Sequence, residues 1–234
     1  GLGGADRYMF DQAELLSEHG CCVNCIAFEN GPLEVLYRRH NIPLTVCAIS
    51  KLNALEISRL VKAYDFIIAN TMYTIFFAAE AQKHKPTMLL LHDCFTFVKN
   101  IIDRTSAAEE DLHMIRHLYC VSKYQAGTLS KLGLNNMRIL NNFVTDIYSP
   151  TRYEKQNMKI KFLTVAHWNP VKGFDLALEA FECLTSGEKE RVEWHIVGQM
   201  EAGKECRRFC DKARAKHWII FHGAIADKKC LYRL

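Results

Sequence analysis

The sequence predicts an α/β protein with two domains, each built around a parallel sheet. Short apolar runs typical of buried strands alternate with helix patterns along the 234 residues. The alternation stops near Tyr148–Asn157, where Ser149-Pro150-Thr151-Arg152 is a turn or linker signal, and then restarts. We therefore predict two domains, residues 1–148 and residues 149–234.

The first domain begins with a glycine-rich segment that leads into a helix. This helix is predicted from Gly4 to Glu18, because Gly20 is a typical helix stop. Strands are then predicted at residues 21–28, 44–49, 65–69, 87–91, 118–121 and 138–140. Further helices are predicted through Ala78 and Ala81, over residues 105–116, and from an N-cap at Ser122 to near Gly133.

The second domain repeats the strand–helix alternation over a shorter length. Strands are predicted at residues 160–165, 192–197 and 218–221, and helices at residues 204–216 and from Asp227. Another helix shows one apolar face at three- and four-residue steps, made by Phe174, Ala177, Leu178, Phe181 and Leu184. No strand precedes the opening glycines, and only three strands follow the linker. We expect the first strand of the N-domain and the last part of the C-domain to be missing.

Composition limits the classes of partner. Hydrophobic residues make up 49% and charged residues 24%, which is ordinary for a globular protein. The net charge of +4, without a dense Lys/Arg run, gives no support for nucleic-acid binding. A mildly basic protein can still meet anionic ligands or an anionic membrane face. No apolar run approaches the roughly 20 residues that span a bilayer, so we expect a cytoplasmic protein with possible peripheral association at the inner membrane face.

Ten cysteines are a high count, but their spacing does not indicate a disulfide framework. Most lie in apolar runs, where cysteine behaves as a small core residue, and a reducing compartment is the simplest setting. The Cys22-x2-Cys25 pair alone resembles part of a zinc or redox site. A zinc site needs two more ligands at suitable spacing, and because no second pair exists we disfavour it.

The segment Val165 to Asp175 has the strongest pattern for ligand binding. A strand ends, a turn containing Pro170 follows, and Lys172-Gly173 opens a helix. Ligands of open α/β sheets bind outside the carboxyl ends of the strands, and a lysine there can reach a diphosphate. The alternative is an ordinary exposed lysine, which is the usual environment of this residue type.

Polar residues also follow two strands of the first domain. His92 and Asp93 follow residues 87–91, and Asn70-Thr71 follows residues 65–69. We expect Asp93 to cap a helix or orient His92 rather than act as a nucleophile. Asn70 and Thr71 either line an acceptor cleft or simply cap the next helix. His92 either acts in a site or is a hydrogen-bonded residue at a strand end.

These segments, in their order, resemble the glycosyltransferases of family 4. Gly3-Gly4-Ala5-Asp6-Arg7 is similar to the family's Gly-Gly-Ala-Glu-Arg loop, and residues 165–175 to its Arg-x-x-x-x-Lys-Gly region. The strand-to-helix turn 121–124, the hinge approach 140–146 and the strand ends 195–198 and 220–223 also resemble family motifs. The resemblance covers nearly the whole chain and implies two Rossmann-like domains of the GT-B type.

The resemblance also implies roles for individual residues. Gly3 and Gly4 with Lys172, Gly173 and Gly198 would bind the donor diphosphate and sugar. His92 would lie beside the donor sugar, and Lys172 and His167 would stabilise the leaving diphosphate without a metal or other cofactor. Asn70, Thr71 and Ser122 would lie on the acceptor side. Gly3 and Lys172 would then border one shared crevice.

The implied activity is retaining transfer of a hexose from a nucleoside diphosphate sugar to a saccharide or lipid-linked saccharide, in polysaccharide biosynthesis. Two departures favour an alternative, a non-catalytic partner subunit that only binds sugar nucleotides. His167 replaces the family's arginine, and the family's later Glu-x7-Glu segment lies beyond Leu234. We expect this fragment alone to be inactive and to leave an edge of its second sheet uncovered.

Overall fold

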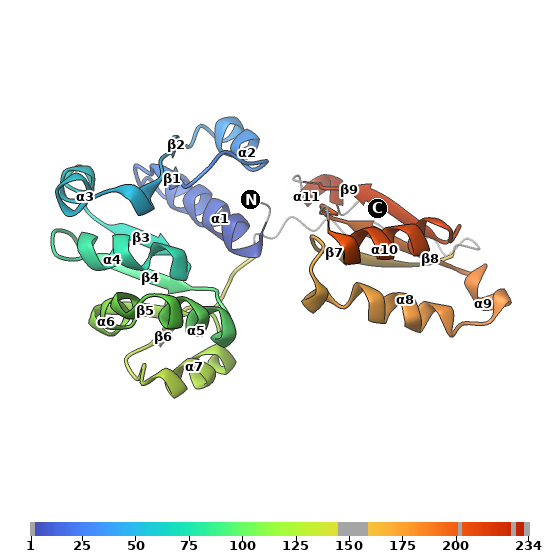
Figure 1. The fold of residues 1–234 in the computed structure, drawn as a ribbon. Helices are drawn as coiled ribbons and strands as arrows, with labels where there is room; N and C mark the ends of the chain where they lie inside the picture. The colour runs from blue at the N-terminus through green and yellow to red at the C-terminus, as the bar shows by residue number, and fades with distance from the viewer. Residues whose placement is uncertain (1–2, 145–158, 201–202, 226–227, 232–234) are drawn as a thin grey trace. The chain divides into compact units, whose positions relative to one another are not determined.

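The computed structural model describes residues 3–144, 159–200, 203–225 and 228–231, which form two α/β units (Figure 1). Unit 1 comprises Gly1–Thr145 and unit 2 comprises Asp146–Leu234. The predicted boundary between residues 148 and 149 lies outside the described residues. Each unit is described separately.

Unit 1 contains two parallel sheets. β1 (Cys25–Ala27) pairs with β2 (Leu44–Val46), and the larger sheet has the order β3-β4-β5-β6. Its strands are β3 (Ile67–Asn70), β4 (Thr87–Leu91), β5 (His117–Cys120) and β6 (Arg138–Ile139). The helices are α1 (Gly4–Glu18), α2 (Glu34–Arg39), α3 (Ala54–Val61), α4 (Ile75–Ala81), α5 (Phe95–Arg104), α6 (Ser106–Met114) and α7 (Lys123–Leu129), with single 3-10 turns at Ile49–Lys51, Met72–Thr74 and Ser130–Leu132.

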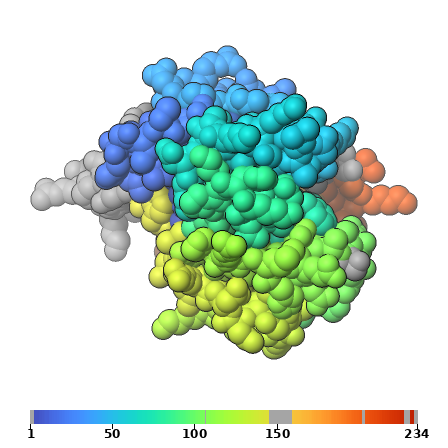
Figure 2. All heavy atoms as spheres, turned by 90° about the vertical axis from the view of Figure 1, so that its left-hand side faces the viewer, coloured from blue at the N-terminus to red at the C-terminus, as the bar shows by residue number. Residues whose placement is uncertain are grey.

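Strand β4 lies at the centre of the unit 1 core, because every one of its side chains is buried. A parallel strand covered on both faces reads as a continuous apolar run, and Thr87–Leu91 has that pattern. Helices α3, α4 and α6 lie side by side on one face of unit 1 (Figure 2). Their apolar side chains, including Ala78 and Leu112, pack into the core beneath.

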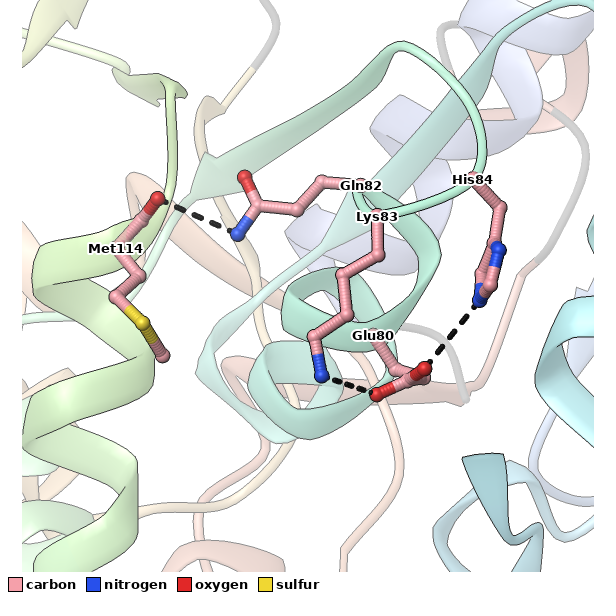
Figure 3. Close-up of polar contacts among 5 residues, drawn as sticks. All are labelled: Glu80, Gln82, Lys83, His84 and Met114. Carbon is pink, nitrogen blue, oxygen red and sulfur yellow. Dashed lines mark hydrogen bonds and ion pairs between the residues drawn. The ribbon is translucent and has the colours of Figure 1, made fainter. Parts of the chain in front are cut away.

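Gln82, after the last turn of α4, ties that helix to the turn between α6 and β5. Its Nε2 donates to the carbonyl of Met114 over 3.3 Å (Figure 3), and its Oε1 accepts from the N–H of Arg116 over 3.2 Å. Glu80 accepts from Lys83 and His84 in the same place. The Gln82 amide thus gives the carbonyl of Met114, the last residue of α6, a donor that the helix itself does not supply.

Unit 2 has one parallel sheet of order β7-β8-β9 among its described residues. The strands are β7 (Ile160–Val165), β8 (Val192–Val197) and β9 (Ile219–Gly223), and the helices are α8 (Phe174–Glu182), α9 (Ser186–Lys189), α10 (Lys204–Arg214) and α11 (Lys228–Leu231), with a 3-10 turn at Pro170–Lys172. An aromatic core fills the unit, with Trp194 stacked on Phe181 at 5.2 Å. On the edge strand β7, Phe162 and Val165 are 45% and 54% exposed.

The structure confirms the predicted class of two parallel α/β units and corrects several details. Helices α2, α3, α5 and α9 were not predicted. For α3 a signal existed, because Asn53 and Glu56 form a reciprocal capping box. The expected core role of the cysteines is wrong for half of them, because five are exposed: Cys21, Cys22, Cys94, Cys183 and Cys230. The start of the last helix at Asp227 lies outside the described residues.

Candidate active site

In unit 1, the candidate residues gather at one edge of the larger sheet. Strands β3, β4 and β5 are parallel neighbours, so their carboxyl ends meet at the same edge. Asn70 ends β3, His92 follows β4, and Ser122 lies just beyond β5. This is the edge at which open α/β sheets bind ligands.

Asn70 connects this edge to the first turn of α1. Its Nδ2 donates to the carbonyl of Ala5 over 3.1 Å, across a sequence separation of 65 residues. Its Oδ1 is buried and has no hydrogen-bond partner among the described residues. A buried acceptor without a partner is costly, so its presence calls for an explanation such as a catalytic role, an ordered water or an ion. Asn70 thus combines a structural bond with an unused acceptor.

The opening glycines lie at the start of α1, as predicted. The N–H of Gly3 donates to Oδ2 of Asp6 over 3.1 Å, and the helix begins at Gly4. A helix start favours an anion, and here the Asp6 carboxylate already takes that place for Gly3. A diphosphate at the Gly3 amide would have to displace this carboxylate. The roles assigned to Gly3 and Gly4 stay predictions.

His92 packs against α1 with an unused ring nitrogen. Its ring centroid lies 4.9 Å from that of Tyr8, and Tyr8 contacts Phe143 at 5.3 Å. Burial lowers the pKa of His92, so its imidazole is neutral at pH 7. Its Nε2 is buried and has no partner among the described residues. Among the described residues this nitrogen has no hydrogen-bond partner of the kind that the alternative expected, and the role of His92 stays a prediction.

Thr71 adopts a backbone conformation that a β-branched residue rarely takes. Its φ is 71° and its ψ is 161°. Such a conformation costs of order 1–3 kcal/mol and persists only where its surroundings fix it. The N–H of Thr71 donates to the carbonyl of Leu90, and its carbonyl accepts from the Thr74 hydroxyl at 2.9 Å. The turn after β3 is therefore strained and firmly held.

Asp93 caps a helical turn, which is one of the two roles predicted for it, but not the helix that follows it in the chain. Its Oδ2 accepts from the N–H of Met72 over 2.6 Å, so it caps the 3-10 turn after the neighbouring strand. Helix α5 instead has Cys94 at its N-cap position. The capping alternative for Asn70 and Thr71 is also wrong, because neither side chain caps the turn at Met72. Local spacing suggested a cap by these residues, but the donor of Met72 is satisfied from another strand.

Ser122 caps α7 as predicted, with its Oγ accepting from the N–H of Gln125 over 3.1 Å. Sequence reasoning missed the side-chain hydrogen bonds of Gln125 to the backbone of Val121 and Asp93. A signal existed in the Ser-x-x-Gln spacing of Ser122 and Gln125, which is typical of a capping box. It also missed Tyr8, which lies on the α1 face toward His92. The acceptor-side roles of Asn70, Thr71 and Ser122 stay predictions.

In unit 2, buried Trp168 anchors the loop after β7. It stacks on Phe174 at 5.4 Å and lies 4.9 Å from Phe209. Oδ1 of Asn169 then accepts from the N–H of Val171 over 3.1 Å, which starts the 3-10 turn ending at Lys172. Because the packing of Trp168 and the hydrogen bond of Asn169 hold this loop, its exposed residues have a defined position at the sheet edge.

Two candidate side chains of this loop, His167 and Lys172, are exposed. Gly173 follows with φ 68°, a left-handed conformation that suits glycine, and occupies the N-cap position of α8. The N–H groups in the first turn of α8 have no partner within the helix and carry partial positive charge. Lysine and helix start together form an electropositive edge.

Gly198 brings the ends of β7 and β8 into close contact. A Cβ at this position would lie 1.8 Å from the carbonyl oxygen of Ala166 and 3.0 Å from the nitrogen of His167. Only glycine allows this approach. The structure therefore places Gly198 directly against the loop that carries His167 and Lys172. Whether these residues bind a donor stays a prediction, as does a crevice shared with Gly3, which belongs to the other unit.

Among the described residues, no group of three or more His, Cys, Asp or Glu side chains could hold a metal ion. Independence from metals stays a prediction. No helix in the described ranges is both long and apolar enough to cross a membrane.

Two α/β units, with polar residues and glycines at the carboxyl edges of their parallel strands, define a protein of the Rossmann-like α/β class. The family model described as Glycosyltransferase Family 4 matches residues 2–146, and that described as Glycosyl transferases group 1 matches residues 149–234. The chain therefore belongs to the family 4 glycosyltransferases. A search of curated protein sequences found no match.

Solved structures show the same GT-B fold. Anabaena Alr3699/HepE, solved in complex with UDP-glucose, is similar with a TM-score of 0.77 at 18% identity, over 98% of this chain and 68% of that one. A glycosyltransferase from Rickettsia africae ESF-5 has a TM-score of 0.70 at 16% identity, over 98% and 67%. WaaG, a glycosyltransferase involved in lipopolysaccharide biosynthesis, has 0.65 at 13%, over 98% and 69%. At these identities the likeness shows the fold alone.

Proposed function

We propose that the protein is a retaining glycosyltransferase that moves a hexose from a nucleoside diphosphate sugar to a saccharide or lipid-linked saccharide. The observation that carries this proposal is the loop after β7, fixed by Trp168 and by the close approach of Gly198. It presents Lys172 beside the start of α8. Family membership over both units and the UDP-glucose bound to Alr3699/HepE support a nucleotide-sugar donor.

The proposed chemistry is electrostatic. Negative charge develops on the diphosphate as the bond to the sugar breaks. The Lys172 ammonium and the N–H groups at the start of α8 would stabilise that charge, and no bound metal is required in this scheme. The exposed imidazole of His167, in the same loop, would add a further hydrogen-bond donor. Fixed donors of this kind cost little reorganisation during the reaction, which is why they accelerate it.

His92 would lie beside the sugar, where its neutral ring and unused Nε2 can hydrogen-bond a hydroxyl group. Asn70 would offer its Oδ1 to a second hydroxyl. The neighbouring carboxylate of Asp93 is already bonded to Met72, so it is not offered as a nucleophile. The proposed retention therefore uses no covalent sugar–enzyme intermediate, and the leaving phosphate takes the acceptor proton on the same face.

Lys172→Ala in the full-length protein tests the proposal. Loss of one preorganised donor typically lowers kcat by about 100-fold or more, and we expect at least that loss in sugar transfer. Lys212→Ala, an exposed lysine in the last turn of α10, is the matched control and should transfer normally. Turnover of Lys172→Ala equal to that of the wild type would refute the role of this lysine. NMR of the product tests retention, because the anomeric configuration of the donor sugar should be kept. Because the scheme requires no metal, we expect the transfer rate to be unchanged in EDTA.

The presence of histidine at position 167, in place of the arginine of the family motif, favours a second function. A histidine carries less positive charge at neutral pH than the arginine of the family motif, which weakens diphosphate stabilisation and suits a non-catalytic partner subunit that binds sugar nucleotides. A thermal-shift screen with UDP-, GDP- and ADP-sugars separates the two functions, because binding to the folded state raises Tm. A Tm increase without any sugar transfer would favour the subunit.

We further propose a cytoplasmic protein that meets a lipid-linked acceptor at the inner membrane face. The mild positive charge of the chain is compatible with an anionic surface. Cosedimentation with vesicles containing anionic lipid, compared with neutral vesicles, tests this association. Equal recovery with both kinds of vesicle would count against it.

A further inference from the structure

Two side chains join three neighbouring loops at the carboxyl edge of the unit 1 sheet. Gln125, only 7% exposed, accepts with Oε1 from the N–H of Val121 over 2.8 Å and donates with Nε2 to the carbonyl of Asp93 over 2.7 Å. Asp93 in turn accepts with Oδ2 from the N–H of Met72 over 2.6 Å. The chain of bonds runs from the loop after β5, through the loop after β4, to the loop after β3. We name it the Gln125–Asp93–Met72 clasp.

The clasp lies beyond the last backbone hydrogen bond between β3 and β4. The β3–β4 ladder ends with the bond from Thr71 N–H to Leu90, and the next donor along the chain is Met72. Loops beyond a ladder are held only by specific contacts. Since both polar ends of the buried Gln125 side chain are used, its geometry is set by both partners. The clasp therefore fixes the spacing of the three loops.

The residues that the clasp holds are neighbours of the candidate site. His92 immediately precedes Asp93, and strained Thr71 immediately precedes Met72. Asn70, with its unused Oδ1, is one residue further. A bond at Asp93 thus limits the movement of the His92 backbone, and a bond at Met72 limits that of the Asn70–Thr71 turn.

We propose that Asp93 and Gln125 are positioning residues that act through His92 and Asn70 in sugar transfer. This inference rests on the proposed function and deepens it. Misplacement of a reacting group by about 1 Å can cost about 100-fold in rate. The effect should fall on kcat, because the clasp holds the backbone of His92 and Asn70, which are proposed to meet the reacting sugar.

Matched substitutions of Asp93 separate positioning from charge. Asp93→Asn keeps an oxygen that can accept from Met72 N–H but removes the charge, whereas Asp93→Ala removes the acceptor. In the full-length protein we expect kcat within about 3-fold of the wild type for Asp93→Asn and a decrease of about 30- to 100-fold for Asp93→Ala. The KM for the donor should change by less than about 3-fold in both. A wild-type kcat in Asp93→Ala would overturn the proposal.

A double-mutant cycle with His92→Ala tests whether the clasp acts through His92. If it does, the kcat of His92→Ala/Asp93→Ala should equal that of His92→Ala alone, except for the decrease that arises from displacement of Asn70. Fully multiplicative losses would overturn action through His92. If Asp93→Ala does not fold, Gln125→Met replaces it in both experiments, because it keeps the side-chain volume and removes only the bonds to Val121 and Asp93.

A measurement independent of activity distinguishes failure of this inference from failure of the proposed function. The Met72 amide should be protected from hydrogen exchange in the wild type and in Asp93→Asn, and should exchange at least about 10-fold faster in Asp93→Ala. Absence of sugar transfer in the wild type would refute the proposed function. The existence of the clasp would then be decided by the exchange rate of the Met72 amide alone. Equal exchange in all three proteins would overturn the clasp itself.

Discussion

Substitution of Gly198 by alanine should destabilise unit 2 strongly. Its φ of 151° is unusual for a residue with a side chain, and the added Cβ would lie 1.8 Å from the Ala166 carbonyl oxygen. This is roughly 1.5 Å short of ordinary contact. Relief requires β7 and β8 to separate at their ends, since the clash is with backbone atoms.

The cost follows from the backbone hydrogen bonds at that place. Two backbone hydrogen bonds join the ends of β7 and β8 there: Ala166 N–H donates to Val197 and Trp168 N–H to Gln199, both at 2.9 Å. At about 1 kcal/mol each, their loss amounts to about 2 kcal/mol. For a domain of this size each kcal/mol lowers Tm by about 4–8 °C, so we expect a decrease of about 8–16 °C.

Scanning calorimetry of the wild type and Gly198→Ala measures this shift in the unit 2 transition. Gly187→Ala is the matched control, because no atom lies within 4 Å of its added Cβ and it sits within α9. That control should be neutral or stabilising by up to about 1 kcal/mol, since alanine favours helix. A Tm decrease below about 3 °C in Gly198→Ala would refute the close-approach argument.

Three further predictions concern stability. Thr71→Gly should raise the unfolding free energy by about 1 kcal/mol, because it relieves backbone strain of about 1–3 kcal/mol against an entropic cost of about 0.5–1; an unchanged or lower denaturation midpoint would argue against strain. Gln82→Leu should cost about 1 kcal/mol by urea unfolding, since it removes two partly exposed hydrogen bonds; no loss would mean that water replaces them fully. Burial, with His195 and Lys161 nearby, lowers the pKa of His222 below its usual 6.5, so the unfolded chain binds more protons than the native unit between the two pKa values. The stability of unit 2 should therefore fall as pH drops from 7 through that window, and His222→Gln should reduce the change in Tm; an identical pH dependence in the variant would contradict this.

The sequence by itself determined the class of the fold and the places where chemistry is concentrated. The apolar run Thr87–Leu91 predicted a buried parallel strand, and its end predicted the position of His92 at the sheet edge. The N-cap at Ser122 and the turn at Pro170 were likewise local features of sequence, although α8 begins at Phe174 and not at the predicted Lys172-Gly173. Local patterns succeed here because strand burial and helix capping depend on residues close together in the chain.

Only the tertiary structure decided how these places are connected. Met72 is capped by Asp93 from the loop after β4, Asn70 reaches Ala5 across 65 residues, and Gly198 excludes a side chain because Ala166 of the loop after β7 lies against it. Such contacts depend on which strands become neighbours, and the order of strands is set by packing of the whole sheet rather than by any one segment. The same sequence spacing that suggests a local cap is therefore overruled when a distant carboxylate satisfies the donor first.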